Sequence, residues 1–239
     1  MPVFDRRVAL PFAILGFLLG LSGVLASSLE DGGYGWGNLA YFTIWTNIAA
    51  TVLFALWAIH MRKPDERDPV SPAISAASNP ALIHSPDPAQ TNPSPTLRRW
   101  TMYITSSIIL VLVAYWTLLA PVSEYPLVTF SNMTTHLATP ILFTTFYLTC
   151  VRPGAIRPRD IPLSMDIPIV YVIFAYALHA AGYVFTHDLE GRAVRFPYFF
   201  LDFHDIGWTW VAIYIVAIAV GVALLSTLFW AIDRRRANS

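Results

Sequence analysis

The sequence has little charge and almost no cysteine. Only 13% of its 239 residues are Asp, Glu, Lys or Arg, and 56% are hydrophobic, whereas a soluble domain carries about 25% charged residues. The single cysteine, Cys150, excludes an intramolecular disulfide and any metal site made of several cysteines. The histidines show no HExxH-like spacing either. These shortages exclude an ordinary soluble domain, a disulfide scaffold and a zinc-protease motif.

Long apolar runs take the place of the missing charge. Each is close to the roughly 20 residues that cross a hydrocarbon core about 30 Å thick. Six stand out: Val8–Ser27, Leu39–Met61, Trp100–Pro121, Asn132–Val151, Ile167–Thr186 and Ile206–Ile232. Eight Trp residues also suit the two interfaces of a bilayer. We therefore predict an all-α integral membrane protein, with residues 1–239 forming one six-transmembrane-helix bundle.

The positive charges alternate between the connections of this bundle. Thirteen of the fifteen Lys and Arg residues precede the first run, lie in the second and fourth connections, or follow the last run. The connections at 28–38 and 122–131 have none, and the one at 187–205 has only two. Because cationic loops stay in the cytoplasm, we predict a multi-pass protein of the plasma or inner membrane with both termini cytoplasmic.

Two segments could be something other than a membrane span or a short connection: the first apolar run and the proline-rich stretch at residues 64–99. Val8–Ser27 follows Arg6 and Arg7 as in a signal peptide, but its apolar length exceeds the usual core of about 7–15 residues, so we expect it to be retained. Residues 64–99 contain eight of the eighteen prolines, among Ser, Asn, Ala and Asp. Such a composition cannot bury enough apolar surface to fold, so we predict a flexible cytoplasmic linker there.

His136 lies within the fourth run and is costly to keep in a membrane without a partner or a task. Pro140 has no N–H, so in a helix it cannot bond to the carbonyl of His136. The histidine is thus expected at a loosened turn. One explanation is a kinked helix whose histidine bonds to a neighbouring helix.

Polar groups from four predicted helices gather near the outer face. Thr43, Thr46 and Asn47 share one face of the second run, and Thr43 enters to about the depth of His136. Histidine is the commonest base that activates a hydroxyl nucleophile. The side chains expected to support this pair, by donating to an oxyanion or orienting a histidine, are Asn47, Asn132, His179, Asp202 and Asp205.

Three segments resemble motifs of a known family. Tyr41-Phe-Thr-Ile-Trp-Thr-Asn47, His136-Leu-Ala-Thr-Pro140 and Arg195-Phe-Pro-Tyr-Phe-Phe-Leu-Asp202 resemble, in order, those of the Pr-six-Pr family of bacterial six-transmembrane proteins. That family is distantly similar to the androgen-induced-gene and androgen-dependent TFPI-regulating proteins, six-span hydrolases of fatty acid esters of hydroxy fatty acids. The resemblance implies a six-span fold, with Thr43 as nucleophile and His136 as the catalytic histidine.

The resulting hypothesis is an intramembrane lipid ester hydrolase that acts near the outer face. Membrane lipids and a long-chain fatty acyl ester are its expected partners, without nucleic acid, a known protein partner or a cofactor. One alternative is a non-catalytic membrane scaffold or lipid-binding protein, whose polar residues only join helices. A further alternative is a metal or haem protein, since the histidines and aspartates are acceptable ligand types.

Overall fold

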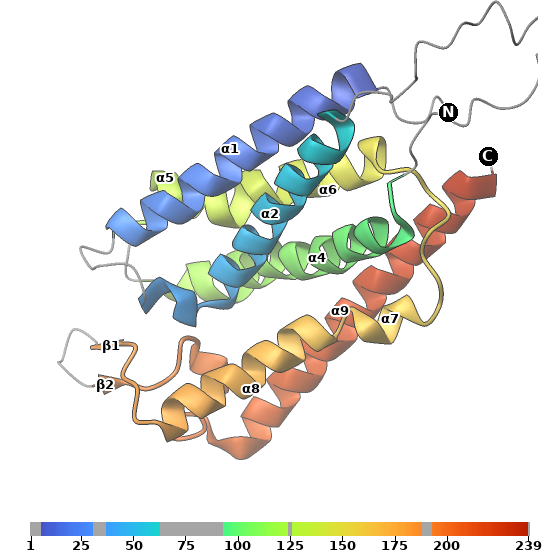
Figure 1. The fold of residues 1–239 in the computed structure, drawn as a ribbon. Helices are drawn as coiled ribbons and strands as arrows, with labels where there is room; N and C mark the ends of the chain where they lie inside the picture. The colour runs from blue at the N-terminus through green and yellow to red at the C-terminus, as the bar shows by residue number, and fades with distance from the viewer. Residues whose placement is uncertain (1–5, 31–36, 63–92, 124–125, 188–192, 239) are drawn as a thin grey trace, which may run out of the picture.

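The structure, a computed structural model, describes residues 6–30, 37–62, 93–123, 126–187 and 193–238. Its long helices run along one another as a bundle (Figure 1). Five described helical segments are long and apolar enough to cross a membrane: Arg6–Leu29, Phe42–Arg62, Pro95–Val122, Asp160–Ala180 and Gly207–Asn238. The prediction of a membrane protein with transmembrane helices is confirmed at this level.

The five segments correspond to named helices. They are α1 (Arg6–Glu30), α2 (Phe42–Arg62), α4 (Pro95–Ala114) with its continuation to Val122, α7 (Asp160–Leu163) followed by α8 (Asp166–Ala180), and α9 (Gly207–Asn238). Helix α1 begins and α9 ends at the end of the bundle where α2 ends and α4 begins (Figure 1). We call the opposite end, where α2 and α9 begin, the distal end.

The fourth predicted run is helical throughout, but its hydrogen-bond pattern changes from α to π and back to α. It consists of α5 (Phe130–Met133), a π-helical turn (Thr134–Ala138) and α6 (Thr139–Cys150). Its many Thr residues, together with His136 and Pro140, make it less apolar than the five segments above. The polar side chains are tolerated because much of this helical stretch packs against other helices and not against lipid.

Close helix contact holds α1 on the bundle. A Cβ atom at Gly16 would strike the ring of Phe54 on α2, and one at Gly23 would lie 2.6 Å from the Thr134 side chain. Phe54 in turn packs edge-on against Phe143 of α6, with ring centroids 5.0 Å apart. Glycine is therefore needed at these positions because any side chain would push α1 away from the core.

The proline-rich segment ends earlier than predicted. Helix α4 begins at Pro95, and the side chain of Ser94 accepts a hydrogen bond of 3.1 Å from the Leu97 amide. Serine at the N-cap and proline in the first turn are strong helix-start signals. The predicted linker boundary at residue 99 is therefore wrong, and most of the linker, residues 63–92, lies outside the described residues.

The distal connection before α9 contains the second departure from the prediction. Helix α8 ends at Ala180, short of the predicted Thr186, because Gly182 takes a left-handed conformation with φ +78°. Two short antiparallel strands follow, β1 (Thr186–His187) and β2 (Ala193–Val194). A 3-10 turn, Phe199–Leu201, then leads to α9. Within the described residues, this small ribbon is the only β-structure.

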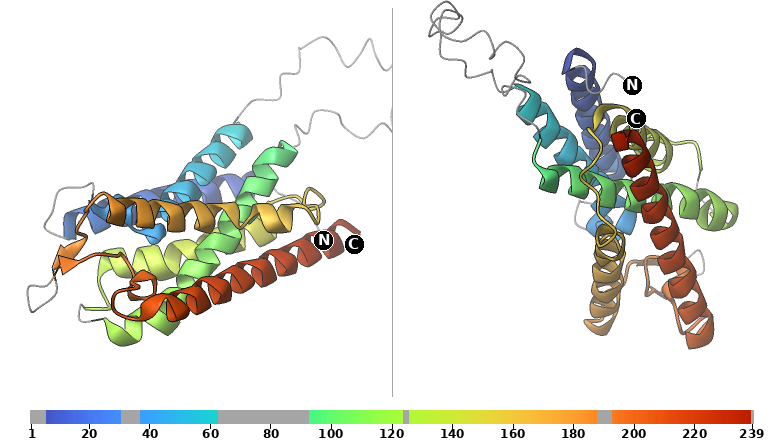
Figure 2. Two further views of the ribbon diagram at one scale, coloured as in Figure 1. Left: turned by 90° about the horizontal axis from the view of Figure 1, so that it is seen from below. Right: turned by 90° about the vertical axis from the view of Figure 1, so that its right-hand side faces the viewer.

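Helices α8 and α9 lie along one side of the bundle, and their axes diverge in the views of Figure 2. An aromatic and aliphatic cluster at the distal end joins α8 to the start of α2 and to the segment before α9. Its buried residues are Phe42, Val111, Tyr171, Ala175, Phe196, Phe200 and Leu201. The separation of α8 from α9 leaves room for the cavity described below.

Two buried aspartates tie the helix ends together opposite the distal end. Asp160 accepts hydrogen bonds from the Tyr103 hydroxyl and the Arg157 amide, both 2.6 Å long. Asp233 on α9 accepts from the backbone amides of Gly154 at 3.0 Å and Ile156 at 3.2 Å. Each buried carboxylate thus has the donors that burial requires.

Candidate active site

The structure brings Thr43 and His136 together. Thr43 Oγ1 lies 3.2 Å from His136 Nε2. Thr43 is in the first turn of α2, and His136 is in the π turn that precedes α6. This distance is within hydrogen-bond reach for a nucleophile and its base. The predicted juxtaposition is confirmed, while the catalytic role of the pair stays a prediction.

A pair of π-helical turns builds the base side of the site. The turn Thr134–Ala138 carries His136, and a second π turn, Tyr115–Leu119, extends α4 beside it. The indole N–H of Trp116 donates to the His136 carbonyl at 3.2 Å. This is the carbonyl that Pro140 was expected to leave without a helical donor. π turns are frequent at functional sites because they redirect side chains.

The partners of His136 Nδ1 fix the histidine tautomer. Thr135 Oγ1 donates to the Ser131 carbonyl at 2.8 Å, so toward His136 Nδ1, 3.1 Å away, it acts as an acceptor. The carbonyl of Asn132, 3.3 Å from the same nitrogen, can only accept. Nδ1 therefore carries the proton. The lone pair of Nε2 is left to accept the hydroxyl proton of Thr43.

The predicted carboxylate partners do not reach this histidine. Asp202 Oδ1 accepts instead from the backbone amide of His204, 2.9 Å away. Asp205 is exposed at the start of α9. The expectation that Asp202 or Asp205 orients a histidine does not hold for His136, because its Nδ1 contacts Thr135 Oγ1 and the Asn132 carbonyl instead.

His179 is also placed away from the pair. Its ring stacks on Phe196, with centroids 4.5 Å apart, and lies 5.5 Å from the ring of His204. These side chains cover the distal segment between α8 and α9 rather than facing Thr43. The predicted depth of His179 was compatible with a contact to the pair, but depth does not determine which neighbour a side chain faces.

The two asparagines support the site as structural links. Asn47 Nδ2 donates to the carbonyls of Thr43 at 2.8 Å and Thr135 at 3.1 Å. Asn132 Nδ2 donates to the carbonyl of Leu127 at 2.8 Å and to the hydroxyl of Tyr115. Both amide hydrogens of each side chain are therefore in use. The predicted oxyanion role of Asn47 and Asn132 does not fit this arrangement.

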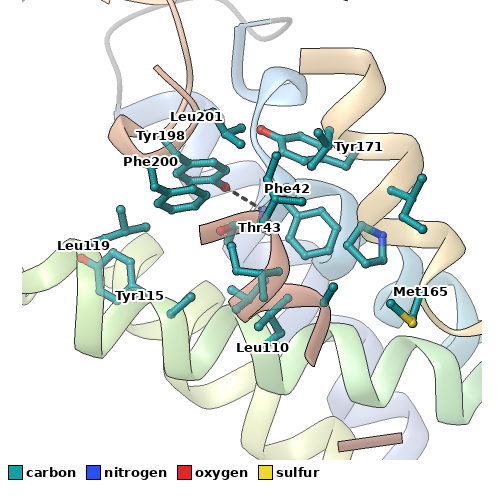
Figure 3. A pocket seen from close by; sticks show the side chains of 18 of the residues that line it. Phe42, Thr43, Leu110, Tyr115, Leu119, Met165, Tyr171, Tyr198, Phe200 and Leu201 are labelled. Carbon is teal, nitrogen blue, oxygen red and sulfur yellow. Dashed lines mark hydrogen bonds between the residues drawn. The ribbon is translucent and has the colours of Figure 1, made fainter. Parts of the chain in front are cut away.

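Tyr198, which was not among the predicted site residues, lies beside Thr43. The backbone N–H of Thr43 donates to the Tyr198 hydroxyl at 3.4 Å (Figure 3). This amide is in the first turn of α2, where N–H groups have no partner within the helix. Burial raises the pKa of Tyr198, so the phenol keeps its proton. A neutral hydroxyl and a backbone N–H thus lie side by side at Thr43.

An apolar cavity of about 210 Å³ ends at this group. Thr43 and Tyr198 meet at its polar end (Figure 3). Apart from the hydroxyl groups of Tyr115 and Tyr171, the other lining side chains are apolar. The ring of Tyr115 stacks on that of His136 with centroids 3.7 Å apart. Thr43, the candidate nucleophile, therefore lines the apolar cavity, whereas His136, the candidate base, is not one of its lining residues.

The start of α2 also contributes electrostatically. The N-terminus of a helix carries a partial positive charge and favours negative charge nearby. Thr43 is the second residue of α2, so charge that develops on its oxygen, or on an oxygen next to it, is stabilised.

Four side chains of this site were missed at the sequence level: Tyr115, Trp116, Thr135 and Tyr198. Tyr198 lies inside the Arg195–Asp202 motif, which was a usable signal. Tyr115 and Trp116 belong to a π turn that shifts them to the His136 face, which helical periodicity does not predict.

The metal alternative gains nothing from the geometry. Among the residues that the structure describes, no group of three or more His, Cys, Asp or Glu side chains could hold a metal ion. Comparison with known proteins adds no assignment, since no family model, curated protein or solved structure matches this chain.

Proposed function

We propose that the protein is an intramembrane hydrolase of lipid esters, with Thr43 as the nucleophile and His136 as the general base. The observation that carries the proposal is the 3.2 Å contact between Thr43 Oγ1 and His136 Nε2 at the end of an apolar cavity. An isolated threonine in a membrane helix usually bonds back to its own helix. Here its hydroxyl meets the unprotonated nitrogen of a histidine instead.

The chemistry proceeds through an acyl-enzyme. Thr43 Oγ1 attacks the ester carbonyl carbon while its proton passes to His136 Nε2. The tetrahedral intermediate collapses when the bond to the alcohol oxygen breaks, and His136 returns the proton to that leaving alcohol. Water then attacks the acyl-Thr43 ester, with His136 again accepting and returning a proton. The net result is ester plus water giving acid plus alcohol.

The Thr43 amide and the Tyr198 hydroxyl supply the oxyanion donors in this scheme. In the resting site the amide donates to the hydroxyl over a long 3.4 Å contact. An ester oxygen placed between them would accept from both groups. Preorganised donors of this kind are often the largest single contribution to acyl-transfer catalysis.

The cavity and the membrane setting indicate the substrate class. A mostly apolar lining that includes one threonine and three tyrosines suits a long-chain fatty acyl ester. The resemblance to the Pr-six-Pr family narrows this class to esters such as those between fatty acids and hydroxy fatty acids. None of the described residues that line the cavity is charged, so the free carboxylate of such an ester would lie outside the cavity.

The proposed topology has six spans, with Phe130–Cys150 as the fourth and both termini in the cytoplasm of a plasma or inner membrane. Its support is the alternating charge, together with the shared end at which α1 begins and α9 ends (Figure 1). The distal end, and with it Thr43, then faces outward. Reagent labelling of cysteines placed in the 28–38 and 187–205 connections tests this orientation.

The activity test compares purified wild-type protein with Thr43→Ala, Thr43→Ser and His136→Ala on a long-chain ester in nanodiscs. We expect both alanine variants to lose at least about 10³-fold in kcat, with Thr43→Ser retaining measurable turnover. Trapping of an acyl group on the Thr43 peptide by mass spectrometry identifies the nucleophile. Wild-type rates in either alanine variant would rule out the mechanism.

A lipid-binding protein without catalysis is the second candidate. It is favoured by Thr46 Oγ1 and Asn47 Nδ2, which bond to the Thr43 carbonyl and act only as links. Under this alternative the cavity binds a fatty acyl chain and no ester is cleaved. Wild-type protein that binds a long-chain ester and returns it intact would favour this function.

A further inference from the structure

We infer that the cavity is entered sideways from the lipid, through an opening beside α8, and not from the aqueous distal face. This inference rests on the proposed function in one respect only, the identification of the occupant as the acyl chain of an ester. The entry route itself follows from which lining residues are covered and which are exposed.

The distal side of the cavity is closed by packed side chains. Leu201 is 1% exposed, Phe200 7% and Tyr171 3%, and all three line the cavity. The Tyr171 hydroxyl also donates to the Ala40 carbonyl at 2.8 Å, which fixes α8 to the segment before α2. A substrate arriving from water would have to displace this cover.

The α8 side of the cavity is open. Ile169 and Ile173 line the cavity, yet 49% and 64% of their surfaces are exposed. They are four residues apart and so lie on the same face of the helix. A side chain that borders the cavity while about half or more of its surface is exposed must stand at a rim. The rim therefore runs along α8 between these two isoleucines.

The surroundings of this rim are apolar. Ile218 and Ala219 of α9 line the cavity from the other side and are partly buried. Val170, next to Ile169, is 54% exposed without lining the cavity. Exposed aliphatic side chains along a span face hydrocarbon rather than water. The opening between α8 and α9 therefore meets lipid tails.

A sideways entrance has a consequence for substrate selection. The ester must reach Thr43 at the distal end, so the acyl chain lies along α8 with its tail toward the opening. A chain longer than the cavity extends through the rim into the bilayer and meets no wall. Preference is therefore expected for lipids dissolved in the membrane, with a broad tolerance of chain length.

The first experiment measures occupancy and needs no turnover. Full-length protein in nanodiscs is irradiated with a fatty acid that carries a diazirine near its methyl end, and adducts are mapped by mass spectrometry. We expect adducts on the α8 and α9 peptides that contain Ile169, Ile173 and Ile218, in Thr43→Ala as in wild type. Adducts confined to α1 or to the distal segment 193–205 would overturn the inference.

The second experiment tests whether a larger side chain at the rim obstructs the opening. Ile173→Trp places a large side chain at the opening, and Val170→Trp is the matched control on the same helix, exposed but outside the cavity. We expect Ile173→Trp to lower labelling about tenfold or more, because overpacking a confined site is strongly unfavourable, with Val170→Trp unchanged. Equal labelling of both variants, with wild-type melting temperatures, would refute a sideways entrance.

Hydrolysis separates the inference from the proposed function. If wild-type protein cleaves esters, Ile173→Trp should reduce kcat/KM for a long-chain ester about tenfold or more, while Val170→Trp stays close to wild type. If wild-type protein cleaves no ester but the labelling pattern holds, the catalytic proposal fails and the lipid entrance stands. An equal kcat/KM in Ile173→Trp and Val170→Trp, both at wild-type stability, would count against the entrance.

Discussion

Replacement of Tyr198 by Phe removes one hydroxyl and leaves the ring in place. The Thr43 amide, the second proposed oxyanion donor, is unchanged by the substitution. Loss of one such donor typically lowers kcat by about 10²–10³-fold. Since the remaining amide still donates, we expect the lower end of this range, about 10²-fold, which corresponds to about 2.7 kcal/mol of transition-state stabilisation.

The substitution should cost little stability. The Thr43 amide loses an acceptor that is already 3.4 Å away, and a buried donor left without a partner costs about 1–3 kcal/mol. The length of the contact and the adjoining cavity place the expected loss near the lower value. A fall in kcat much larger than the fall in stability is therefore the expected signature.

The assay measures kcat and KM for a long-chain ester, alongside thermal unfolding, in the same nanodisc preparation. Tyr176→Phe is the matched control, because the Tyr176 hydroxyl donates to the Leu201 carbonyl at 2.9 Å in the same distal region. We expect it to lose stability with little change in kcat. Wild-type kcat in Tyr198→Phe, or an equal fall in both variants, would refute the oxyanion role.

Three further substitutions test the site and its scaffold. Thr135→Val removes an acceptor from His136 Nδ1 and should lower kcat by roughly 3–10-fold, the effect of one neutral hydrogen bond, with Thr135→Ser restoring the rate. An unchanged kcat in Thr135→Val would contradict a role for Thr135 in orienting His136. Asp233→Ala removes the acceptor of two loop amides and should cost about 1–3 kcal/mol of stability, measured by unfolding, with kcat retained at low temperature. Gly16→Ala forces a Cβ atom into the Phe54 ring and should destabilise by about 1–3 kcal/mol; wild-type melting would show that α1 packs less closely than the structure indicates.

The helical membrane fold was predictable because it depends on composition and length. Apolar runs of about 20 residues specify spans almost independently of their neighbours. Their ends were less predictable, because local capping decides them. Ser94 and Pro95 begin α4 inside a segment whose composition predicts a linker, and Gly182 ends α8 early. Both signals were present in the sequence and were outweighed by the composition of the surrounding window.

The central pair of the candidate site was predictable for a similar reason. A histidine in a membrane helix needs a partner, and the charge pattern placed His136 level with Thr43. The supporting residues were not predictable, because their identity depends on which helices are in contact and on whether each turn is α or π. Asp202 fell in the predicted region yet bonds to a nearby amide, while Tyr198 reaches Thr43.

The winding of Thr134–Ala138 gives the site a dependence on residue count. Each residue of an α-helix turns the chain by about 100°, and a π turn accommodates one residue more than an α turn. Deleting Ala138 would restore regular winding, keep α6 seated in the core and swing the imidazole about 100° away from α2. The alignment of His136 with Thr43 thus depends on the one additional residue in the π turn, whichever amino acid that residue is.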